Sequence, residues 1–204
     1  MIADEVGLGK TIEAGLILTE LRSRFDIRKV LVVCTAMLRS KWKDELRKRF
    51  GISSEMAKPK DLLDTFREIK AGERIDYTFI SGMQGLRPRK EWEDEKKRKD
   101  HASLLARFME ENQDEEPLID LLIIDEAHYM RNPESMTSQL GRLLKGISAN
   151  ILLLSATPIH LRNQDLYRLL NLVDEDTFNQ PSVFDEILRA NEPIMKATED
   201  RKSV

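Results

Sequence analysis

The first residues of the chain combine glycine, lysine and threonine in an order that suits phosphate binding. Two glycines let backbone N–H groups close around phosphate oxygens, and the lysine after them can reach the terminal phosphates. The threonine hydroxyl can bind Mg²⁺, at a helix start that favours anions. The pattern therefore predicts a nucleoside triphosphate site. Its residues are Asp4, Glu5, Val6, Gly7, Leu8, Gly9, Lys10 and Thr11.

A glycine turn before a surface helix is the alternative interpretation of this segment. The general phosphate-loop pattern places a glycine five residues before Gly9, and this chain has Asp4 there. The segment taken alone leaves both interpretations open, so the prediction depends on what other motifs accompany it.

Two carboxylates, Asp125 and Glu126, follow the apolar run at residues 121–124. At the carboxyl end of a buried strand they would lie where open α/β sheets bind ligands. Asp125 can hold Mg²⁺ together with Thr11, and Glu126 can orient and deprotonate the water that attacks the γ-phosphoryl group. We predict Lys10, Asp125 and Glu126 as the catalytic residues. A solvated helix cap would explain the acidic residues, but not their pairing with an upstream phosphate loop.

Three polar residues near predicted strand ends are candidates for a supporting role: His128, Ser155 and Thr157. The two hydroxyls follow the next apolar run and can bond to His128 or to the carboxylates. The alternative interpretation is a strand that simply ends at Pro158. A lone histidine is often only a satisfied polar residue, and no second His or Cys stands at a spacing typical of zinc ligands.

The elements that must position these residues are short apolar runs separated by segments of helical spacing. Continuous apolar residues at 30–34, 77–81, 121–124 and 151–154 predict strands buried on both faces. Apolar residues at intervals of three or four predict helices over 12–25, 38–50 and 136–144. Alternating strands and helices indicate an α/β domain with a mostly parallel sheet and helices on both faces.

The composition is that of one globular domain. The 204 residues are 41% hydrophobic and 34% charged, and no window approaches the roughly 20 apolar residues that span a bilayer. Cys34, the single cysteine, excludes an intramolecular disulfide, so we expect a cytoplasmic protein with no membrane contact. The formal net charge of -3 means that any contact with nucleic acid must come from local basic patches.

Two segments depart from the alternation of strands and helices. Residues 87–116 are the most polar stretch and predict a charged helical insertion, whose small apolar face consists of Leu104, Leu105, Phe108 and Met109. Residues 192–204 predict a polar tail. We therefore expect one domain over residues 1–191 that contains the insertion.

The three motifs, in this order, resemble motifs I, II and III of the first RecA-like lobe in helicase superfamily 2. Residues 3–15 resemble the phosphate loop of Swi/Snf-type ATPases, a family that includes the bacterial RNA-polymerase-associated translocase and in which Asp4 is usual. Residues 157–178 are similar to the segment after motif III in that family. RNA helicases of the DEAH-box group share the four-residue motif at 125–128 but lack this phosphate-loop sequence.

The resemblance implies a P-loop lobe that binds ATP and Mg²⁺ and, when joined to a second lobe, couples ATP hydrolysis to movement on duplex DNA. It implies a coupling role for His128, Ser155 and Thr157, and RNA polymerase as a possible protein partner. Because the chain starts just before the phosphate loop, we expect a truncated lead-in strand. Because the family places its arginine finger in the second lobe, we expect the isolated chain to be inactive. A strand-separating helicase, a restriction-type motor and an inactive remnant are the alternatives.

Basic residues after two of the predicted strands are candidates for contact with the DNA backbone. The first group lies on the helix that contains Trp42, and the second follows the strand at 77–81. A solvated surface is the alternative, because acidic residues interrupt the helix face. We expect the apolar residues of that helix, Trp42, Leu46 and Phe50, to belong to the core. The basic candidates are Lys41, Lys43, Arg47, Lys48, Arg49, Arg87, Arg89 and Lys90.

Overall fold

Six strands form one sheet in the order β1-β6-β5-β2-β4-β3, in which every neighbouring pair is parallel. The structure is a computed structural model and describes residues 1–3, 9–94, 96, 100–113, 115–155, 163–173, 178 and 184. The strands are β1 Ile2–Ala3, β2 Lys29–Cys34, β3 Glu55–Met56, β4 Tyr77–Gly82, β5 Ile119–Ile124 and β6 Ser148–Ser155. The prediction of a mostly parallel α/β sheet is confirmed.

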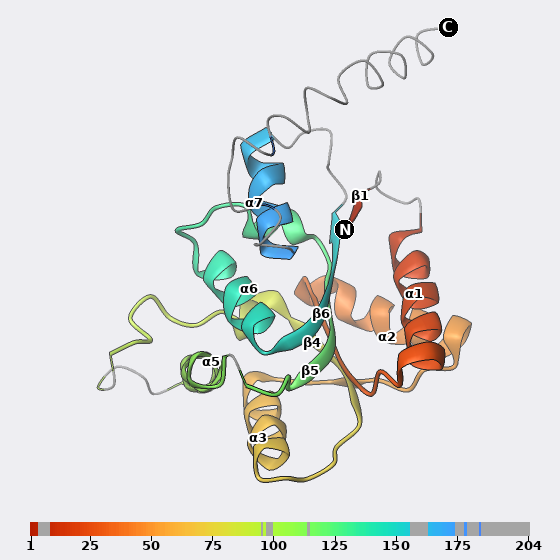
Figure 1. The fold of residues 1–204 in the computed structure, drawn as a ribbon, viewed down its shortest axis with the longest axis horizontal. Coiled ribbons are helices and arrows are strands. Elements are labelled where there is room, and N and C mark those ends of the chain that lie inside the picture. Colours follow the sequence, from red (N-terminus) through yellow and green to blue (C-terminus); the bar gives the residue numbers. More distant parts are fainter. Residues whose placement is uncertain are drawn as a thin grey trace, which may run out of the picture.

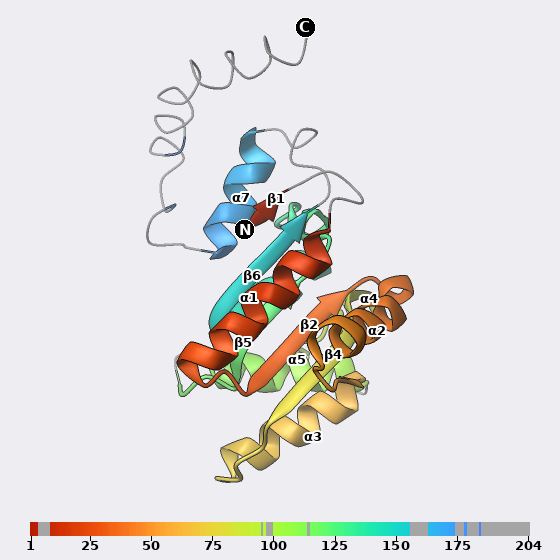
Figure 2. The ribbon, with the colours of Figure 1, turned by 90° about the vertical axis from the view of Figure 1, so that its right-hand side faces the viewer.

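Helices cover both faces of this sheet (Figures 1 and 2). One face is packed by α1 Lys10–Phe25 and α2 Arg39–Phe50, and the other by α3 Pro59–Lys70, α5 His101–Glu111, α6 Met136–Gly146 and α7 Asn163–Val173. The shorter elements are α4 Met83–Leu86 and the 3₁₀ helices η1 Ala36–Leu38 and η2 Ala127–Met130. No helix in the described part of the chain is long and apolar enough to span a membrane.

The central strands explain why continuous apolar runs predicted this sheet. In β2, Leu31 and Val33 point into the core under α3, α5 and α6, while Val30 and Val32 point into the core under α1 and α2. Successive side chains of a strand point to opposite faces, so a strand covered on both faces needs apolar residues at every position. All four predicted strands are present, as β2, β4, β5 and β6.

The strand before the phosphate loop is represented by two residues. Ile2 pairs with Leu154 and Ala3 with Ser155, which makes β1 a parallel neighbour of β6. This pairing fixes the chain at the edge of the sheet just before the phosphate loop begins. Residues 4–8 themselves lie outside the described residues, as do 156–162 and 192–204.

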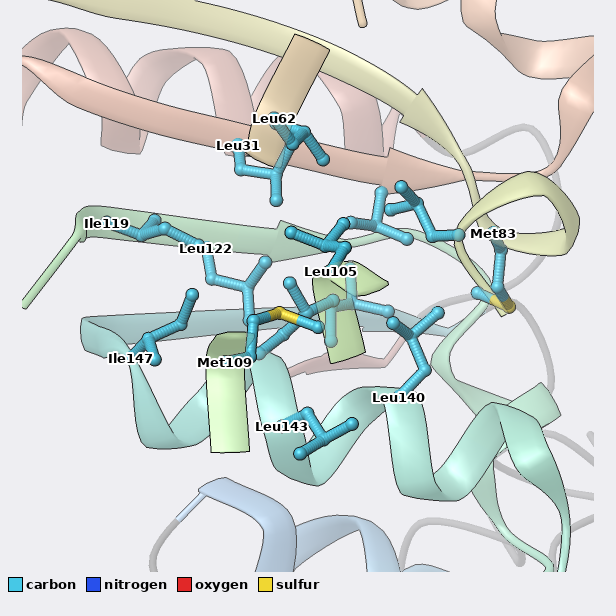
Figure 3. Close-up of a cluster of buried hydrophobic side chains, with 14 of the residues drawn as sticks. Leu31, Leu62, Met83, Leu105, Met109, Ile119, Leu122, Leu140, Leu143 and Ile147 are labelled. Atoms are coloured by element: carbon cyan, nitrogen blue, oxygen red, sulfur yellow. The ribbon is translucent and has the colours of Figure 1, made fainter. Parts of the chain in front are cut away.

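The apolar side of the polar segment 87–116 belongs to the main core. Leu105 and Met109 of α5 are fully buried, and Leu104 and Phe108 pack partly buried against the same cluster (Figure 3). Trp92, which the sequence analysis does not assign to the core, is only 1% exposed. Among the described residues of this segment the helix is α5 alone, whose outer side carries Arg107, Glu110 and Glu111, and the bounds of an insertion stay a prediction.

Helices α1 and α2 approach closely at a glycine. A methyl group at Gly15 would lie 2.1 Å from Cε2 of Phe50. We expect Gly15→Ala to lower the free energy of unfolding by about 1–3 kcal/mol, since overpacking outweighs the helix propensity that alanine gains. Urea denaturation measures this difference. Gly85→Ala is the control, because an added methyl at Gly85 has no neighbour within 4 Å. Equal destabilisation by both substitutions would contradict the packing argument.

Candidate functional site

Helix α1 begins at the end of the predicted phosphate loop. Gly9 precedes it with φ 93° and ψ 18°, a left-handed conformation that favours glycine. The carbonyl of Gly9 accepts from the N–H groups of Ile12 at 2.7 Å and Glu13 at 3.1 Å, which starts the helix. The N–H groups of a first helical turn attract anions. Lys10 is buried, with 9% of its surface exposed, and Thr11 is half-buried.

A cavity of about 320 Å³ brings the two main predicted motifs together. The first turn of α1 forms one wall, the residues after β5 form another, and the beginning of α2 closes the third side. Its volume lies at the lower end of the range typical of ligand sites, about 300–1,000 Å³. The lining residues are Gly9, Lys10, Thr11, Ile12, Leu38, Lys41, Trp42, Glu45, Asp125 and Glu126.

Asp125 is held rigidly at the carboxyl end of β5. Its backbone N–H donates to the carbonyl of Val33 in the neighbouring strand at 2.8 Å. Its Oδ2 accepts from the indole Nε1 of Trp42 at 2.8 Å, and its Oδ1 accepts from the backbone N–H of Glu126 at 2.9 Å. The side chain is 6% exposed. Both carboxylate oxygens therefore have a fixed direction, as a metal ligand requires.

Glu126 occupies a backbone conformation that is unusual for a residue with a side chain. Its φ of 56° and ψ of 45° lie in the left-handed region, and such residues cluster at functional sites. Oε2 of Glu126 lies 3.2 Å from Nδ1 of His128, but the two atoms lack the alignment of a hydrogen bond, and neither has a hydrogen-bond partner among the described residues. The two side chains therefore lie in close polar contact.

The predicted supporting hydroxyls are only partly placed by the structure. Ser155 lies fully buried at the carboxyl end of β6, and its Oγ has no hydrogen-bond partner among the described residues. The expected bond from Ser155 to His128 or to a carboxylate is therefore not formed within that part of the chain. Thr157 and the loop residues Asp4, Glu5, Val6, Gly7 and Leu8 lie outside the described residues, so their roles stay predictions.

Cys34, at the end of β2, is buried beside the site but is not one of its reactive groups. Desolvation raises the pKa of its thiol to about 12, the charge of Asp125 raises the pKa further, and Arg39 opposes the shift. At neutral pH the thiol is protonated and is neither a nucleophile nor a metal ligand. Cys34 is a free, buried cysteine.

Trp42 is the site residue whose polar role the sequence analysis misses. The prediction that Trp42 and Leu46 belong to the core is confirmed, since they are 1% and 0% exposed. The indole N–H of a buried tryptophan usually finds an acceptor, which could have directed attention to the carboxylates. The identity of that acceptor depends on β2 and β5 being neighbours, which the sequence does not show.

The predicted basic residues differ in their surroundings. Lys48 pairs with Asp44 at 3.2 Å, Arg49 pairs with Glu45, and Arg89 pairs with Asp100 at 3.1 Å. Lys41, Lys43 and Arg47 are exposed on α2 and form no ion pair with another described residue. These three exposed charges of α2 therefore have no ion-pair partner among the described residues.

Comparisons with known proteins agree with this site. The chain is 30% identical over 204 residues to the uncharacterised ATP-dependent helicase YqhH of Bacillus subtilis (strain 168), covering 100% of this chain and 31% of that protein. It is 28% identical over 200 residues to the RNA polymerase-associated protein RapA of Vibrio campbellii (strain ATCC BAA-1116), covering 97% of this chain and 19% of RapA. The chain thus spans a third or less of these relatives.

A protein of known structure has a similar fold. The SWI2/SNF2 ATPase core of Sulfolobus solfataricus, solved in complex with double-stranded DNA, superposes with a TM-score of 0.58 at 18% identity, covering 91% of this chain and 33% of that one. At this identity the likeness shows the fold alone. The SNF2-related domain family matches residues 1–203, almost the whole chain. With the phosphate loop, the carboxylate pair and the parallel sheet in the expected order, the chain belongs to the SNF2-related domain family of the helicase superfamily.

Proposed function

We propose that this chain is the ATP·Mg²⁺-binding lobe of a DNA-dependent ATPase that moves along duplex DNA. The observation that carries the proposal is that Lys10 and Thr11, at the end of the phosphate loop, line the same cavity as Asp125 and Glu126. These residues are more than 100 positions apart in the sequence, and the order of the strands brings them together. A glycine turn before a surface helix would not require this convergence.

The residues of the cavity fit Mg²⁺ better than a metal that needs a full protein cage. In the described part of the chain, no three His, Cys, Asp or Glu side chains form a group that could hold a metal ion. Mg²⁺ is usually bound by one or two protein oxygens together with phosphate oxygens and waters. Asp125 and Thr11 would supply the protein oxygens. The ion, when bound, neutralises charge that develops on the transferred phosphoryl group.

Glu126 would act on the attacking water. Its place directly after Asp125 brings a second carboxylate to the cavity, and a carboxylate that does not bind the metal can orient a water and accept its proton. His128 lies against Oε2 of Glu126 and would fix the direction of that carboxylate once the two align. Lys10 would bind the terminal phosphates at the first turn of α1.

Duplex DNA is the proposed polymer, bound in part by exposed basic side chains of α2. Lys41, Lys43 and Arg47 present positive charge there, and contacts to phosphates grip DNA without reading its sequence. The similar Sulfolobus core binds double-stranded DNA, which supports this choice. A DNA complex that contains RNA polymerase is the second proposed partner, because RapA is an RNA polymerase-associated protein. A strand-separating helicase is the alternative, which the name of YqhH favours.

Phosphate release tests the proposed activity. In a protein that joins this chain to a second RecA-like lobe, we expect duplex DNA to stimulate ATP hydrolysis, and we expect the stimulation to fall as salt rises, because phosphate contacts release counterions. A parallel assay with a labelled forked duplex distinguishes translocation from strand separation. Equal hydrolysis with and without DNA at low salt would contradict the proposal.

A further inference from the structure

Helix α2 contacts the site through one buried side chain. Trp42 lies on the inner side of α2 with 1% of its surface exposed, and its indole Nε1 donates to Oδ2 of Asp125 at 2.8 Å. The ring packs in the cluster that also contains Val32, Leu46 and Leu121, between α1, α2 and the sheet. The hydrogen bond therefore joins a helix on one face of the sheet to the carboxylate at the end of β5.

The two donors to Asp125 are not equivalent. The N–H that reaches Oδ1 belongs to Glu126, the next residue in the chain, and can follow Asp125 if that segment moves. The indole comes from an element 83 residues away and is fixed by its own packing. A carboxylate that is 6% exposed has little water to replace a lost donor. The Trp42 indole is thus the donor that fixes the orientation of Oδ2 of Asp125 relative to the rest of the protein.

We propose that Trp42 is a positioning residue that orients the Asp125 carboxylate for Mg²⁺. The proposal rests on the proposed ATP·Mg²⁺ site and adds a residue to it. Partners of metal ligands in the surrounding shell fix the ligand's orientation, and their loss typically lowers metal affinity or activity by about 10- to 100-fold. Because α2 also presents the exposed Lys41, Lys43 and Arg47, the indole connects this basic helix to the carboxylate proposed to bind the metal.

Trp92 provides a matched control for the loss of an indole. It is the second of the two tryptophans, it is also 1% exposed, and it packs in the cluster on the other face of the sheet. It is not among the residues that line the cavity. Trp42→Phe and Trp92→Phe therefore remove the same atoms from equally buried positions, but only Trp42→Phe removes a donor to Asp125.

The experiment measures binding of a fluorescent ATP analogue to the 204-residue chain by anisotropy, in EDTA and across a titration of Mg²⁺. We expect Trp42→Phe to raise the Mg²⁺ concentration for half-maximal enhancement of binding by about 10- to 100-fold and to leave binding in EDTA unchanged. Trp92→Phe is expected to leave both unchanged. Replacing Trp42 by 3-benzothienylalanine, which keeps the shape of the ring and lacks the N–H, should reproduce Trp42→Phe even if the phenylalanine variant folds poorly.

A spectroscopic readout separates positioning from packing. In the Trp92→Phe protein, Trp42 is the remaining indole, and its emission is expected to shift when Mg²⁺ joins the nucleotide-bound protein, because its N–H partner gains a cation. Asp125→Asn should abolish that shift.

An unchanged Mg²⁺ dependence of nucleotide binding in the benzothienylalanine variant would overturn the role of Trp42 and leave the proposed ATP site intact. Failure of the unsubstituted chain to bind the analogue, or binding that Lys10→Ala leaves intact, would overturn the site and the inference together.

Discussion

Replacing Glu126 by glutamine is expected to slow ATP hydrolysis by about 10²- to 10⁴-fold while ATP·Mg²⁺ stays bound. Glutamine preserves the shape of the side chain and one oxygen, but it cannot accept the proton of the attacking water. Asp125 and Thr11, which we propose as the metal-binding residues, are unaltered. Single-turnover phosphate release, in the protein joined to a second lobe, measures the chemical step. Equilibrium binding of the nucleotide to the same variant measures affinity.

Glu45→Gln is the control for this experiment. Glu45 is a second glutamate at the wall of the cavity, but it belongs to α2 and pairs with Arg49. Glu45→Gln removes one negative charge from the same cavity and leaves Glu126 unchanged. We expect turnover within a few-fold of the unsubstituted protein. Near-normal turnover of Glu126→Gln, or equal losses in the two variants, would contradict the assignment of Glu126 as the base.

Lys10→Ala is expected to weaken ATP binding by about 1.5–3 kcal/mol, the value of a hydrogen bond to a charged group, which corresponds to about 10- to 100-fold in Kd. Lys10 stands at the first turn of α1 and lines the cavity, where a phosphate would meet both its ammonium group and the helix N-terminus. Titration of the nucleotide by calorimetry measures the difference.

Lys41→Ala separates a specific phosphate contact from the general charge of the cavity. Lys41 also lines the cavity, but it is exposed on α2 and lies outside the phosphate loop. We expect its loss to change nucleotide affinity less than the loss of Lys10 at every salt concentration. If the two lysine variants bind ATP equally well, the phosphates do not lie at the start of α1.

The sequence predicted those parts of the fold whose signals are local. Residues 30–34 and 121–124 are apolar at every position because β2 and β5 are buried on both faces, and their short length favours a strand over a buried helix. Helix α3 is not predicted although its signal is also local: Leu62, Leu63 and Phe66 are buried at helical spacing, and Pro59 stands at the helix start. Strand β3 has only two residues, too few for a periodic pattern.

The residues of the candidate site could be predicted from their types and positions in the sequence. The contacts between them could be seen only in the three-dimensional structure. Lys10, Asp125 and Glu126 could be named because strand ends and helix starts are the places where α/β sheets bind ligands. The bond from Trp42 to Asp125 could not, since it depends on the pairing of Val33 with Ile124 and on the angle at which α2 packs. The left-handed backbone of Glu126 likewise leaves no trace in composition or periodicity.

Calorimetric titration of ATP·Mg²⁺ into the 204-residue chain tests most directly whether this cavity is a nucleotide site. The account predicts saturable binding of one nucleotide per chain, weaker when EDTA removes the metal, and lost in a chain that carries both Lys10→Ala and Asp125→Asn. Binding that persists undiminished in the double variant would place the nucleotide elsewhere. The absence of any saturable binding by the unsubstituted chain would contradict the account as a whole.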